Sequence, residues 1–397
     1  MTIKQHIFII GSRGLPARYG GFETFVEQLI TNQKSKEIKY HVACQTSNSE
    51  YGKLGKRFDY LTADCFNVEV PEIGSARAII YDIKAIHAAL KIIKEEQIAH
   101  PIFYLLGNTI GGVIGHFYKL IHRAGGVMYV NPDGLEWRRT KWAKPIRQYF
   151  KYAERKMTQY ADLVICDSPG IESYLAREYQ RYQPQMTYIA YGTDTTPTTL
   201  KKNDTVVRDW FEKFNVKEQE YYLIVGRLVP ENNYETMLRE FMHASTKRKL
   251  VLITNTTEGS FFDELKNKLS FENDPRIHFV GSVYDQNLLK YIRENAIAYL
   301  HGHEVGGTNP SLLEALMSSK LNLLFDVEFN RRVAEDSALY WTKAEGNLRQ
   351  LIERVEKIDP LEYQVFQKIS QQRVYDYFTW DHIVNEYETL FLTGKID

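Results

Sequence analysis

The sequence predicts an α/β protein of two domains, each built on a parallel sheet of the doubly wound, Rossmann-like kind. The chain has 397 residues, whereas a single hydrophobic core rarely grows beyond about 250 residues. Apolar runs of strand length alternate with amphipathic segments of helical period, which is typical of a parallel sheet covered on both faces. This alternation stops at a polar segment rich in threonine and proline, residues 193–204, and then starts again. Two such domains are expected to face each other across a cleft.

The first domain is expected over residues 1–192 and the second over residues 205–375, with residues 193–204 as the linker. Strand-like runs of the first are 6–11, 40–46, 102–108, 126–131 and 162–168, with helical segments at 21–30, 76–93 and 111–125. Strand-like runs of the second are 221–227, 249–255, 277–283, 297–303 and 321–327, with helical segments at 233–244, 287–296 and 310–320. Residues 361–395 are expected to form two helices that separate near Thr379.

Composition excludes several classes of protein. With 44% hydrophobic and 25% charged residues, the chain is typical of a soluble globular protein. Cys44, Cys65 and Cys166 fit neither a disulfide framework nor a zinc site, so we expect buried, reduced thiols. No run approaches the about 18 apolar residues of a membrane-spanning helix, and no signal peptide is apparent, so a cytoplasmic protein is expected. Basic residues prevail in the first half and acidic residues in the second, which suits a first half that meets anionic partners.

A glycine-rich turn, residues 11–21, follows the first predicted strand and leads into a helix near Gly20 and Gly21. Glycine lets the backbone approach a ligand, and a helix N-terminus presents N–H groups and a partial positive charge to phosphate. The spacing is not that of a dinucleotide-binding fingerprint. Phosphate binding at Gly20 and Gly21, and a merely tight turn between strand and helix, are therefore both open.

Arg227 follows the first strand of the second domain, at the carboxyl end where open α/β sheets bind ligands. An arginine in this place can hold a diphosphate through bidentate, charge-assisted hydrogen bonds. The alternative is a surface ion pair with Glu231.

A strand-turn-helix segment later in the second domain predicts a phosphate cradle. Its turn is polar and rich in glycine, and Pro310 stands at the first helical position. We expect the backbone N–H groups of Gly307, Thr308 and Asn309 to bind phosphate, and Glu314 to accept hydrogen bonds from ribose hydroxyls. A structural turn alone would explain the glycines and the proline, but not the polarity of the segment.

Residues 131–156 interleave basic and aromatic side chains. We expect Trp137, Arg138, Arg139, Lys141 and Trp142 to contact a lipid-diphosphate acceptor or an anionic membrane. The alternative is a solvated basic helix with its aromatic side chains in the core. No nucleic-acid-binding module is recognisable, so nucleic acid is not an expected partner.

Two further residues lie just after predicted strands. Asp133 could act as a catalytic base facing the acceptor hydroxyl, or it could cap the turn that it forms with Gly134. Tyr284 would cover a nucleobase if segment 279–284 belongs to a nucleotide-sugar transferase, which its resemblance to such a family implies, or it could be one of many packing tyrosines. No histidine has enough partners at metal-ligand spacing and no pair of aspartates is placed to hold a divalent ion, so neither a metal nor a cofactor is expected.

The segments VGRLVPEN (225–232), FVGSVY (279–284) and GGTNPSLLEAL (306–316) resemble the retaining transferases of glycosyltransferase family 4, which have the GT-B fold. The segments GSRGLPARYGGFETFVE (11–27), NPDGLEWRRTKW (131–142) and HGHEVGGTNPSLLEA (301–315) look more narrowly like the streptococcal-type β-1,4-rhamnosyltransferases of capsule and rhamnan polysaccharide synthesis. The resemblance implies that residues 376–397 form a helix that returns to the first, acceptor-side domain.

This resemblance also implies a reaction. The donor would be dTDP-β-L-rhamnose, the acceptor a sugar on an undecaprenyl-diphosphate lipid, and the protein would lie peripherally on the inner face of the plasma membrane. Glu314 matches the second of two glutamates that the family shares, but Gly306 stands at the first position, and whether the nearby Glu304 substitutes is open. Asn232 stands where the family tends to have a lysine, so Arg227 and backbone amides would have to meet the phosphate charge.

The expected mechanism is stabilisation of the leaving diphosphate by preorganised positive groups. No carboxylate stands out as a covalent nucleophile, so we expect same-face attack by the acceptor hydroxyl, assisted by the leaving phosphate. Three alternatives are a transferase of another nucleotide sugar, a nucleotide-sugar epimerase of the same fold, and a non-catalytic nucleotide-sugar-binding relic. Product analysis with donor alone separates the epimerase, and binding without sugar release would indicate the relic.

Overall fold

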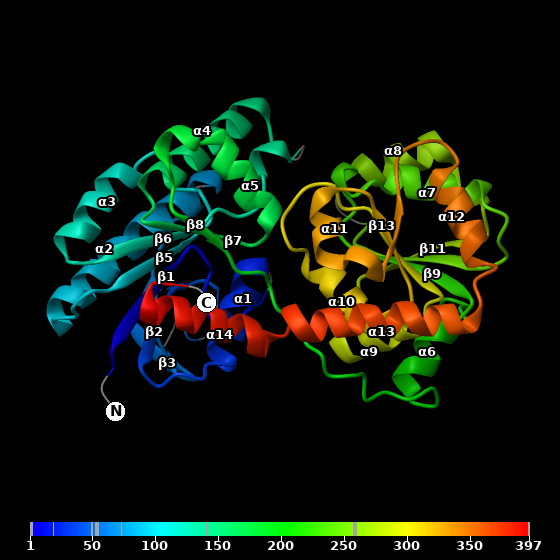
Figure 1. The fold of residues 1–397 in the computed structure, drawn as a ribbon, viewed down its shortest axis with the longest axis horizontal. Helices are drawn as coiled ribbons and strands as arrows, with labels where there is room; N and C mark the ends of the chain where they lie inside the picture. Colours follow the sequence, from blue (N-terminus) through cyan, green and yellow to red (C-terminus); the bar gives the residue numbers. More distant parts are fainter. Residues whose placement is uncertain are drawn as a thin grey trace. The chain divides into compact units, whose positions relative to one another are not determined.

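A computed structural model describes residues 3–18, 20–48, 51, 55–72, 74–139, 142–256 and 260–395. The chain forms two compact units (Figure 1). Unit 1 contains Met1–Gly192 and Trp380–Asp397, and unit 2 contains Thr193–Thr379. Unit 2 is thus one continuous segment, whereas unit 1 is assembled from both ends of the chain.

Unit 1 is built on an 8-stranded sheet with the order β3-β4-β2-β1-β5-β6-β7-β8. The strands are β1 (Gln5–Ile10), β2 (Ile38–Gln45), β3 (Arg57–Tyr60), β4 (Ala63–Val68), β5 (Ile102–Leu106), β6 (Val127–Asn131), β7 (Leu163–Cys166) and β8 (Met186–Tyr188). All pairings are parallel except that of β3 with β4 at the edge. The order of strands reverses between β1 and β5, so the loops after these two strands leave from the centre of the carboxyl edge.

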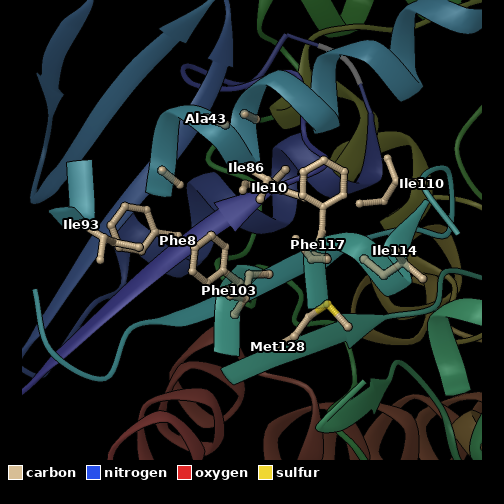
Figure 2. Close-up of a cluster of buried hydrophobic side chains, with 14 of the residues drawn as sticks. Phe8, Ile10, Ala43, Ile86, Ile93, Phe103, Ile110, Ile114, Phe117 and Met128 are labelled. Atoms are coloured by element: carbon tan, nitrogen blue, oxygen red, sulfur yellow. The ribbon is translucent and has the colours of Figure 1, made fainter. Parts of the chain in front are cut away.

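The helices of unit 1 cover both faces of this sheet. They are α1 (Gly21–Thr31), α2 (Arg77–Glu96), α3 (Ile114–Arg123), α4 (Lys144–Tyr160), α5 (Pro169–Glu178) and α14 (Trp380–Thr393). Phe8 and Phe103 project from the strands toward Ile86 of α2 and Phe117 of α3, and together they form the centre of one core (Figure 2). Alternate residues of the same strands face the other way, because successive side chains of a strand point to opposite faces.

The second face of the unit 1 sheet is closed by α14. The hydroxyl groups of Tyr387 and Tyr104 of β5 lie 3.0 Å apart within hydrogen-bonding distance, and the ring of Phe391 packs against Tyr40 of β2. The carboxylate of Glu388 accepts hydrogen bonds from the backbone N–H groups of residues 34 and 35. The final helix is therefore part of the unit 1 core.

Unit 2 is built on a 6-stranded sheet with the order β11-β10-β9-β12-β13-β14. The strands are β9 (Tyr221–Val225), β10 (Lys249–Ile253), β11 (Ile277–Gly281), β12 (Ala298–His301), β13 (Asn322–Phe325) and β14 (Leu339–Trp341), all parallel. In order of appearance along the chain this is the strand order 3-2-1-4-5-6 of dinucleotide-binding folds. The strand order reverses between β9 and β12.

The helices of unit 2 are α6 (Thr205–Lys213), α7 (Tyr234–His243), α8 (Ser260–Leu269), α9 (Gln286–Glu294), α10 (Pro310–Ser318), α11 (Glu328–Ala334), α12 (Asn347–Val355) and α13 (Pro360–Tyr377). One core joins the sheet to α7, α8 and α12, and another joins it to α6 and α9. The segment before α6 is tied to α9, since Lys290 pairs with Asp194 and Thr198 donates a hydrogen bond to the backbone of Asn287.

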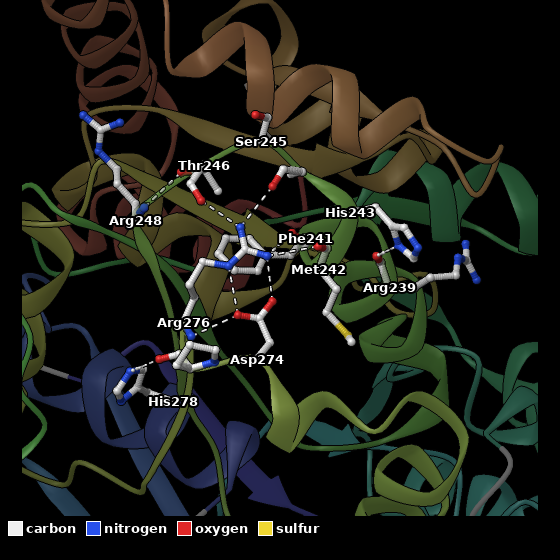
Figure 3. A network of polar contacts seen from close by, with 12 residues as sticks. Arg239, Phe241, Met242, His243, Ser245, Thr246, Arg248, Asp274, Arg276 and His278 are labelled. Atoms are coloured by element: carbon white, nitrogen blue, oxygen red, sulfur yellow. Dashed lines mark hydrogen bonds and ion pairs between the residues drawn. The ribbon is translucent and has the colours of Figure 1, made fainter.

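The C-terminal end of α7 is fixed by an arginine from the segment before β11 (Figure 3). The guanidinium of Arg276 donates hydrogen bonds to the carbonyl groups of Met242, Ala244 and Thr246. It is oriented by the carboxylate of Asp274 at 2.6 Å. A cation at this place satisfies carbonyl groups that the helix itself cannot satisfy, and it holds the helix that begins beside Arg227.

Candidate functional site

The candidate site of unit 2 lies at the switch point of its sheet. Arg227 follows β9, and the loop of residues 302–309 follows β12, which pairs with β9. Ligands of open α/β sheets bind outside the carboxyl ends of the strands at this point. The two loops also contact each other, since the N–H of Glu304 donates to the carbonyl of Glu231 at 3.1 Å. The structure therefore brings the two sequence-predicted phosphate-binding segments together.

Arg227 presents its side chain to solvent. Its carbonyl group accepts hydrogen bonds from the N–H of Val229 at 3.0 Å and from the side chain of Asn232 at 2.9 Å. Its guanidinium makes no ion pair or hydrogen bond with any residue that the structure describes, so the alternative of a pair with Glu231 does not occur. The backbone of Arg227 is fixed while its five N–H donors are available.

The loop after β12 presents backbone donors beside a helix that caps itself. The side chain of Asn309 accepts hydrogen bonds from the N–H groups of Ser311 and Leu312, at 2.9 and 3.3 Å. Asn309 is thus the N-cap of α10, a role that we did not foresee. The N–H groups of Gly306, Gly307 and Asn309 themselves donate to none of the described residues. Gly306 has a φ of 141°, which suits only glycine.

Glu314 is held by an arginine that sequence reasoning missed. Its carboxylate lies 2.5 Å from the guanidinium of Arg293 in α9. The side chain of Arg293 is only 2% exposed, whereas that of Glu314 is 38% exposed. The buried guanidinium of Arg293 binds one side of the Glu314 carboxylate, and the other side remains accessible to a hydroxyl donor. The sequence indicates this role only weakly: Arg293 directly follows the apolar Ile292, and both residues are buried in α9.

Glu304 and Asn232 lie at or near the positions of the family's first glutamate and its lysine, and both bind other residues of unit 2. Glu304 pairs with Lys343, at 2.6 Å, and lies 3.4 Å from the side chain amide of Asn233. Asn232 is buried and binds the carbonyl of Arg227, so it supports the backbone of Arg227 and does not face a ligand. A side chain at Gly302 would collide with the carbonyl of Asn232, which lies 2.2 Å from the place of a Cβ. The loop after β12 therefore packs directly on the turn after Arg227.

Two stacked histidines lie beside this loop. The rings of His301 and His303 are 4.3 Å apart and nearly parallel. His301 is buried, and neither of its ring nitrogens has a hydrogen-bond partner. Burial and the neighbouring His303 lower the pKa of His301 well below its usual range, so the ring is neutral. No group of three metal-ligating side chains occurs among the residues that the structure describes.

Tyr284 lies apart from Arg227 and the loop of residues 302–309. It follows β11, the edge strand, and its side chain is 83% exposed. β11 is separated from β9 by β10, and neighbouring strands lie about 4.8 Å apart, so Tyr284 starts about two strand spacings from Arg227.

The glycine-rich turn of unit 1 surrounds a carboxylate of its own helix. The side chain of Glu23 accepts a hydrogen bond from the N–H of Arg13 at 2.7 Å. Its other oxygen lies 1.8 Å from the place that a Cβ of Gly20 would occupy, and Gly20 has a φ of 136°. Phosphate binding at Gly20 and Gly21 stays a prediction; the anion that the turn accommodates in the structure is Glu23.

Asp133 forms a turn with Gly134, which is the alternative to its predicted role as a catalytic base. Its carboxylate accepts the N–H of Gly134 at 2.7 Å, and its own N–H donates to Asn131 at 3.0 Å. Its φ is 60°, an arrangement that aspartate tolerates better than most residues. Burial and the nearby charge of Asp133 raise the pKa of Asp167, after β7, to about 7.

The basic and aromatic segment is anchored inward. The indole N–H of Trp137 donates to Glu154 at 3.2 Å, and that of Trp142 donates to Glu136 at 2.6 Å. Arg139 pairs with the same Glu136 at 2.6 Å. Buried Glu154 also accepts the hydroxyl groups of Tyr174 and Tyr179, and Lys151 pairs with it. A contact of Trp137, Arg139 and Trp142 with a lipid-diphosphate acceptor or a membrane stays a prediction; in the structure these side chains bind carboxylates of their own unit.

Of the other two residues predicted for the acceptor, Arg138 is exposed and stacks on the ring of Trp137 at 5.1 Å. Lys141 lies outside the described residues. The exposed residues of the following helix α4 are Lys144, Pro145, Gln148 and Tyr152, and the three other than Pro145 form a regular series. These three residues are spaced four apart, so they form one face of the helix. Among the described residues, no helix is long and apolar enough to cross a membrane.

Two family models match the chain. Residues 4–194 match a domain of unknown function, DUF1972. Residues 206–370 match the glycosyl transferases group 1, and this segment contains the whole site at β9 and β12.

Residues 206–370, which carry the site at β9 and β12, are assigned to the glycosyl transferases group 1. The whole chain shares its fold with solved structures. Sucrose-phosphate synthase from Thermosynechococcus elongatus has a TM-score of 0.75 at 17% identity, with 98% of each chain covered. A glycosyltransferase from Rickettsia africae has a TM-score of 0.72 at 12% identity, with 99% of this chain and 100% of that chain covered. The expected GT-B fold, with two Rossmann-like units, is confirmed.

A third similar structure is the Anabaena protein HepE in complex with UDP, with a TM-score of 0.68 at 13% identity. The match covers 97% of this chain and 99% of the Anabaena chain. No curated protein sequence matches the chain. At these identities the structural likeness establishes the fold, and substrate specificity has to be argued from the site itself.

Proposed function

We propose that this group 1 glycosyltransferase binds the diphosphate of a nucleotide-sugar donor at the switch point of unit 2. The observation that carries the proposal is the exposed guanidinium of Arg227 beside the unused N–H groups of Gly306, Gly307 and Asn309. Donors of this kind, fixed in place before the reaction, are what a diphosphate requires. The UDP bound to the Anabaena structure supports a nucleotide in this class of fold.

The proposed chemistry is the loss of the nucleoside diphosphate from the sugar. Negative charge grows on the leaving phosphate as the glycosidic bond breaks, so Arg227 and the amides lower the barrier by stabilising the transition state more than the ground state. Glu314, fixed by Arg293, would accept a hydrogen bond from a ribose hydroxyl. Among the described residues, the carboxylates of Glu231, Glu304 and Glu314 near the site each have a partner, so none stands out as a covalent nucleophile. We therefore propose retention through same-face attack, with no metal and with the leaving phosphate receiving the proton of the acceptor.

The proposed donor is dTDP-β-L-rhamnose, and the proposed acceptor is a sugar on an undecaprenyl-diphosphate lipid, joined by a β-1,4 linkage. This narrower assignment rests on the segments 11–27, 131–142 and 301–315. Deoxyribose would leave Glu314 only the 3′-hydroxyl to bind. Tyr284 and Asp133 keep proposed roles at the base and at the acceptor hydroxyl.

For a lipid acceptor, the protein has to reach the membrane surface. We propose that the face of α4 with Lys144, Gln148 and Tyr152, together with Arg138, makes this contact on the inner side of the plasma membrane. Each basic side chain near an anionic surface contributes about 1 kcal/mol to binding, so the contact is peripheral and reversible.

The test is incubation of the purified chain, with and without a chelator, with a panel of nucleotide sugars and lipid-diphosphate sugars. Products are identified by mass and anomeric configuration. We expect rhamnose transfer with retention and no effect of the chelator, and we expect Arg227→Ala to reduce turnover at least about a hundredfold. Transfer of a different sugar would reject the donor assignment. Conversion of donor without an acceptor would indicate an epimerase, and binding without any sugar release would indicate a relic.

A further inference from the structure

The two carboxylates of the donor site are each paired with a cation. Glu314 pairs with Arg293, and Glu304 pairs with Lys343. The pairs differ in exposure. Arg293 is 2% exposed, whereas the side chains of Lys343 and Glu304 are 49% and 39% exposed. Only the second pair can exchange its partner without moving a buried charge.

Lys343 lies at the same carboxyl edge of the sheet as Arg227, three strand positions along it, because β12 and β13 lie between β9 and β14. It is linked to the site by Glu304, on the loop after β12. It follows β14, and its ammonium group lies 5.4 Å from the centre of the Phe325 ring at the end of β13. Because all strands of unit 2 are parallel, the ends of β9, β12, β13 and β14 share one edge. Lys343 is a residue of a loop, and its long side chain can reach in more than one direction.

A chain of contacts joins Lys343 to the turn after Arg227. The ammonium group of Lys343 contacts the Glu304 carboxylate, which lies 3.4 Å from the amide of Asn233. The neighbouring Asn232 donates to the carbonyl of Arg227 at 2.9 Å. The cation is therefore built into the surroundings of the proposed diphosphate site.

The charge of a diphosphate calls for such a cation. A nucleoside diphosphate carries more than one negative charge, and Arg293 is already paired with Glu314. Arg227 supplies one free positive charge and the amides supply only dipoles. An exposed ion pair such as that of Lys343 with Glu304 contributes little to stability, so exchange of the carboxylate for a phosphate oxygen meets little resistance.

We propose that Lys343 is a second diphosphate-binding cation of this enzyme, and that Glu304 is its counter-ion, which a phosphate oxygen of the donor replaces. This inference rests on the proposed function, because it concerns the same donor site. The role that it assigns to Glu304 is to pair with Lys343, and not to contact the sugar of the donor.

The test measures binding by calorimetry. The wild type is titrated with UDP, dTDP, GDP and ADP, and the diphosphate that binds most tightly is used with all variants, together with its nucleoside. We expect Lys343→Ala to weaken diphosphate binding about tenfold and to leave nucleoside binding unchanged. Lys343→Arg should restore most of the affinity. The matched control is Lys202→Ala, which removes another exposed lysine of unit 2 that is paired with a carboxylate, Glu218, and should change neither affinity.

Glu304→Gln provides the second arm. It frees Lys343, so diphosphate binding should be unchanged or tighter, whereas a glutamate that bound the donor itself would make binding weaker when removed. Equal diphosphate affinity of Lys343→Ala and wild type would overturn the inference and leave the proposed function standing. Failure of the wild type to bind any of the four diphosphates would overturn the proposed function instead.

Discussion

At the scale of single residues, carboxylates of this enzyme are fixed by partners that lie far away in the sequence. Glu314 and Glu304 are held by cations 21 and 39 residues away. In unit 1, Glu23 turns back into the glycine-rich turn, and Glu154 gathers two tyrosine hydroxyls and an indole N–H. These contacts decide which acidic side chains can meet a ligand and which serve the fold.

Asp82 of α2 gives a pH-dependent prediction. It is buried, it accepts a hydrogen bond from the hydroxyl of Thr109, and burial raises its pKa to about 7. In the unfolded chain the pKa is about 3.9. Between pH 4 and pH 7 the Asp82 carboxyl therefore keeps its proton in the folded state and has lost it in the unfolded state. The contribution of Asp82 to the free energy of unfolding is fully present below pH 4 and is lost as the pH rises to 7.

We expect Asp82→Asn, which keeps an uncharged acceptor for Thr109, to stabilise the protein by roughly 4 kcal/mol at pH 8. At pH 4 the variant and the wild type should be equally stable, because both side chains are then neutral. Thermal unfolding of both proteins at the two pH values measures the difference. A gap that is the same at both values would contradict burial as the cause. Asp167 also has a raised pKa, but it is present in both proteins and cancels.

At the scale of elements, the loop and helix after β12 combine two tasks in one residue. The side chain of Asn309 caps α10, while its backbone N–H belongs to the proposed phosphate cradle. The sequence predicts the turn and Pro310 at the first helical position, and the structure agrees. It does not reveal the cap, because a helix N-terminus that awaits a phosphate and one that is capped by its own asparagine have the same pattern.

Three substitutions of Asn309 separate the two tasks. Asn309→Ala removes the cap and should cost about 1 kcal/mol of stability. Asn309→Ser and Asn309→Asp keep a capping oxygen and should retain stability. Only Asn309→Asp brings a negative charge to the proposed diphosphate site, so it alone should be stable and yet bind a nucleoside diphosphate several-fold more weakly. Thermal unfolding combined with calorimetric binding distinguishes these results. Normal binding by Asn309→Asp would place the diphosphate elsewhere.

The whole molecule shows which parts of a fold the sequence specifies. The alternation of strands and helices predicts both parallel sheets, since it depends on local periodicity, and the break near Thr379 predicts the separation of α13 from α14. The inward anchoring of Trp137 and Trp142 could not be predicted, because it depends on Glu136, on Glu154 and on tyrosines of a later helix. Periodicity shows that a segment has a buried face, but not which polar group that face contains.

The contribution of α14 to unit 1 can be tested in the same molecule. Tyr387→Phe removes only the hydroxyl beside Tyr104 and should cost about 1 kcal/mol. Tyr387→Ala leaves a cavity and should cost about 3–5 kcal/mol. Hydrogen exchange should then show lost protection in β1, β2 and α1, while strands of unit 2 keep theirs. Equal loss in both units would mean that they unfold as one.

The assembly of unit 1 from both ends of the chain has a consequence during synthesis. Unit 2 is complete once Thr379 has been added, whereas unit 1 waits for α14. At about 5–20 residues per second, the sheet face that α14 covers stays open for on the order of 10–40 seconds after its own strands have left the ribosome. The domain that is begun first is therefore finished last, and its apolar sheet face is exposed to aggregation during that interval.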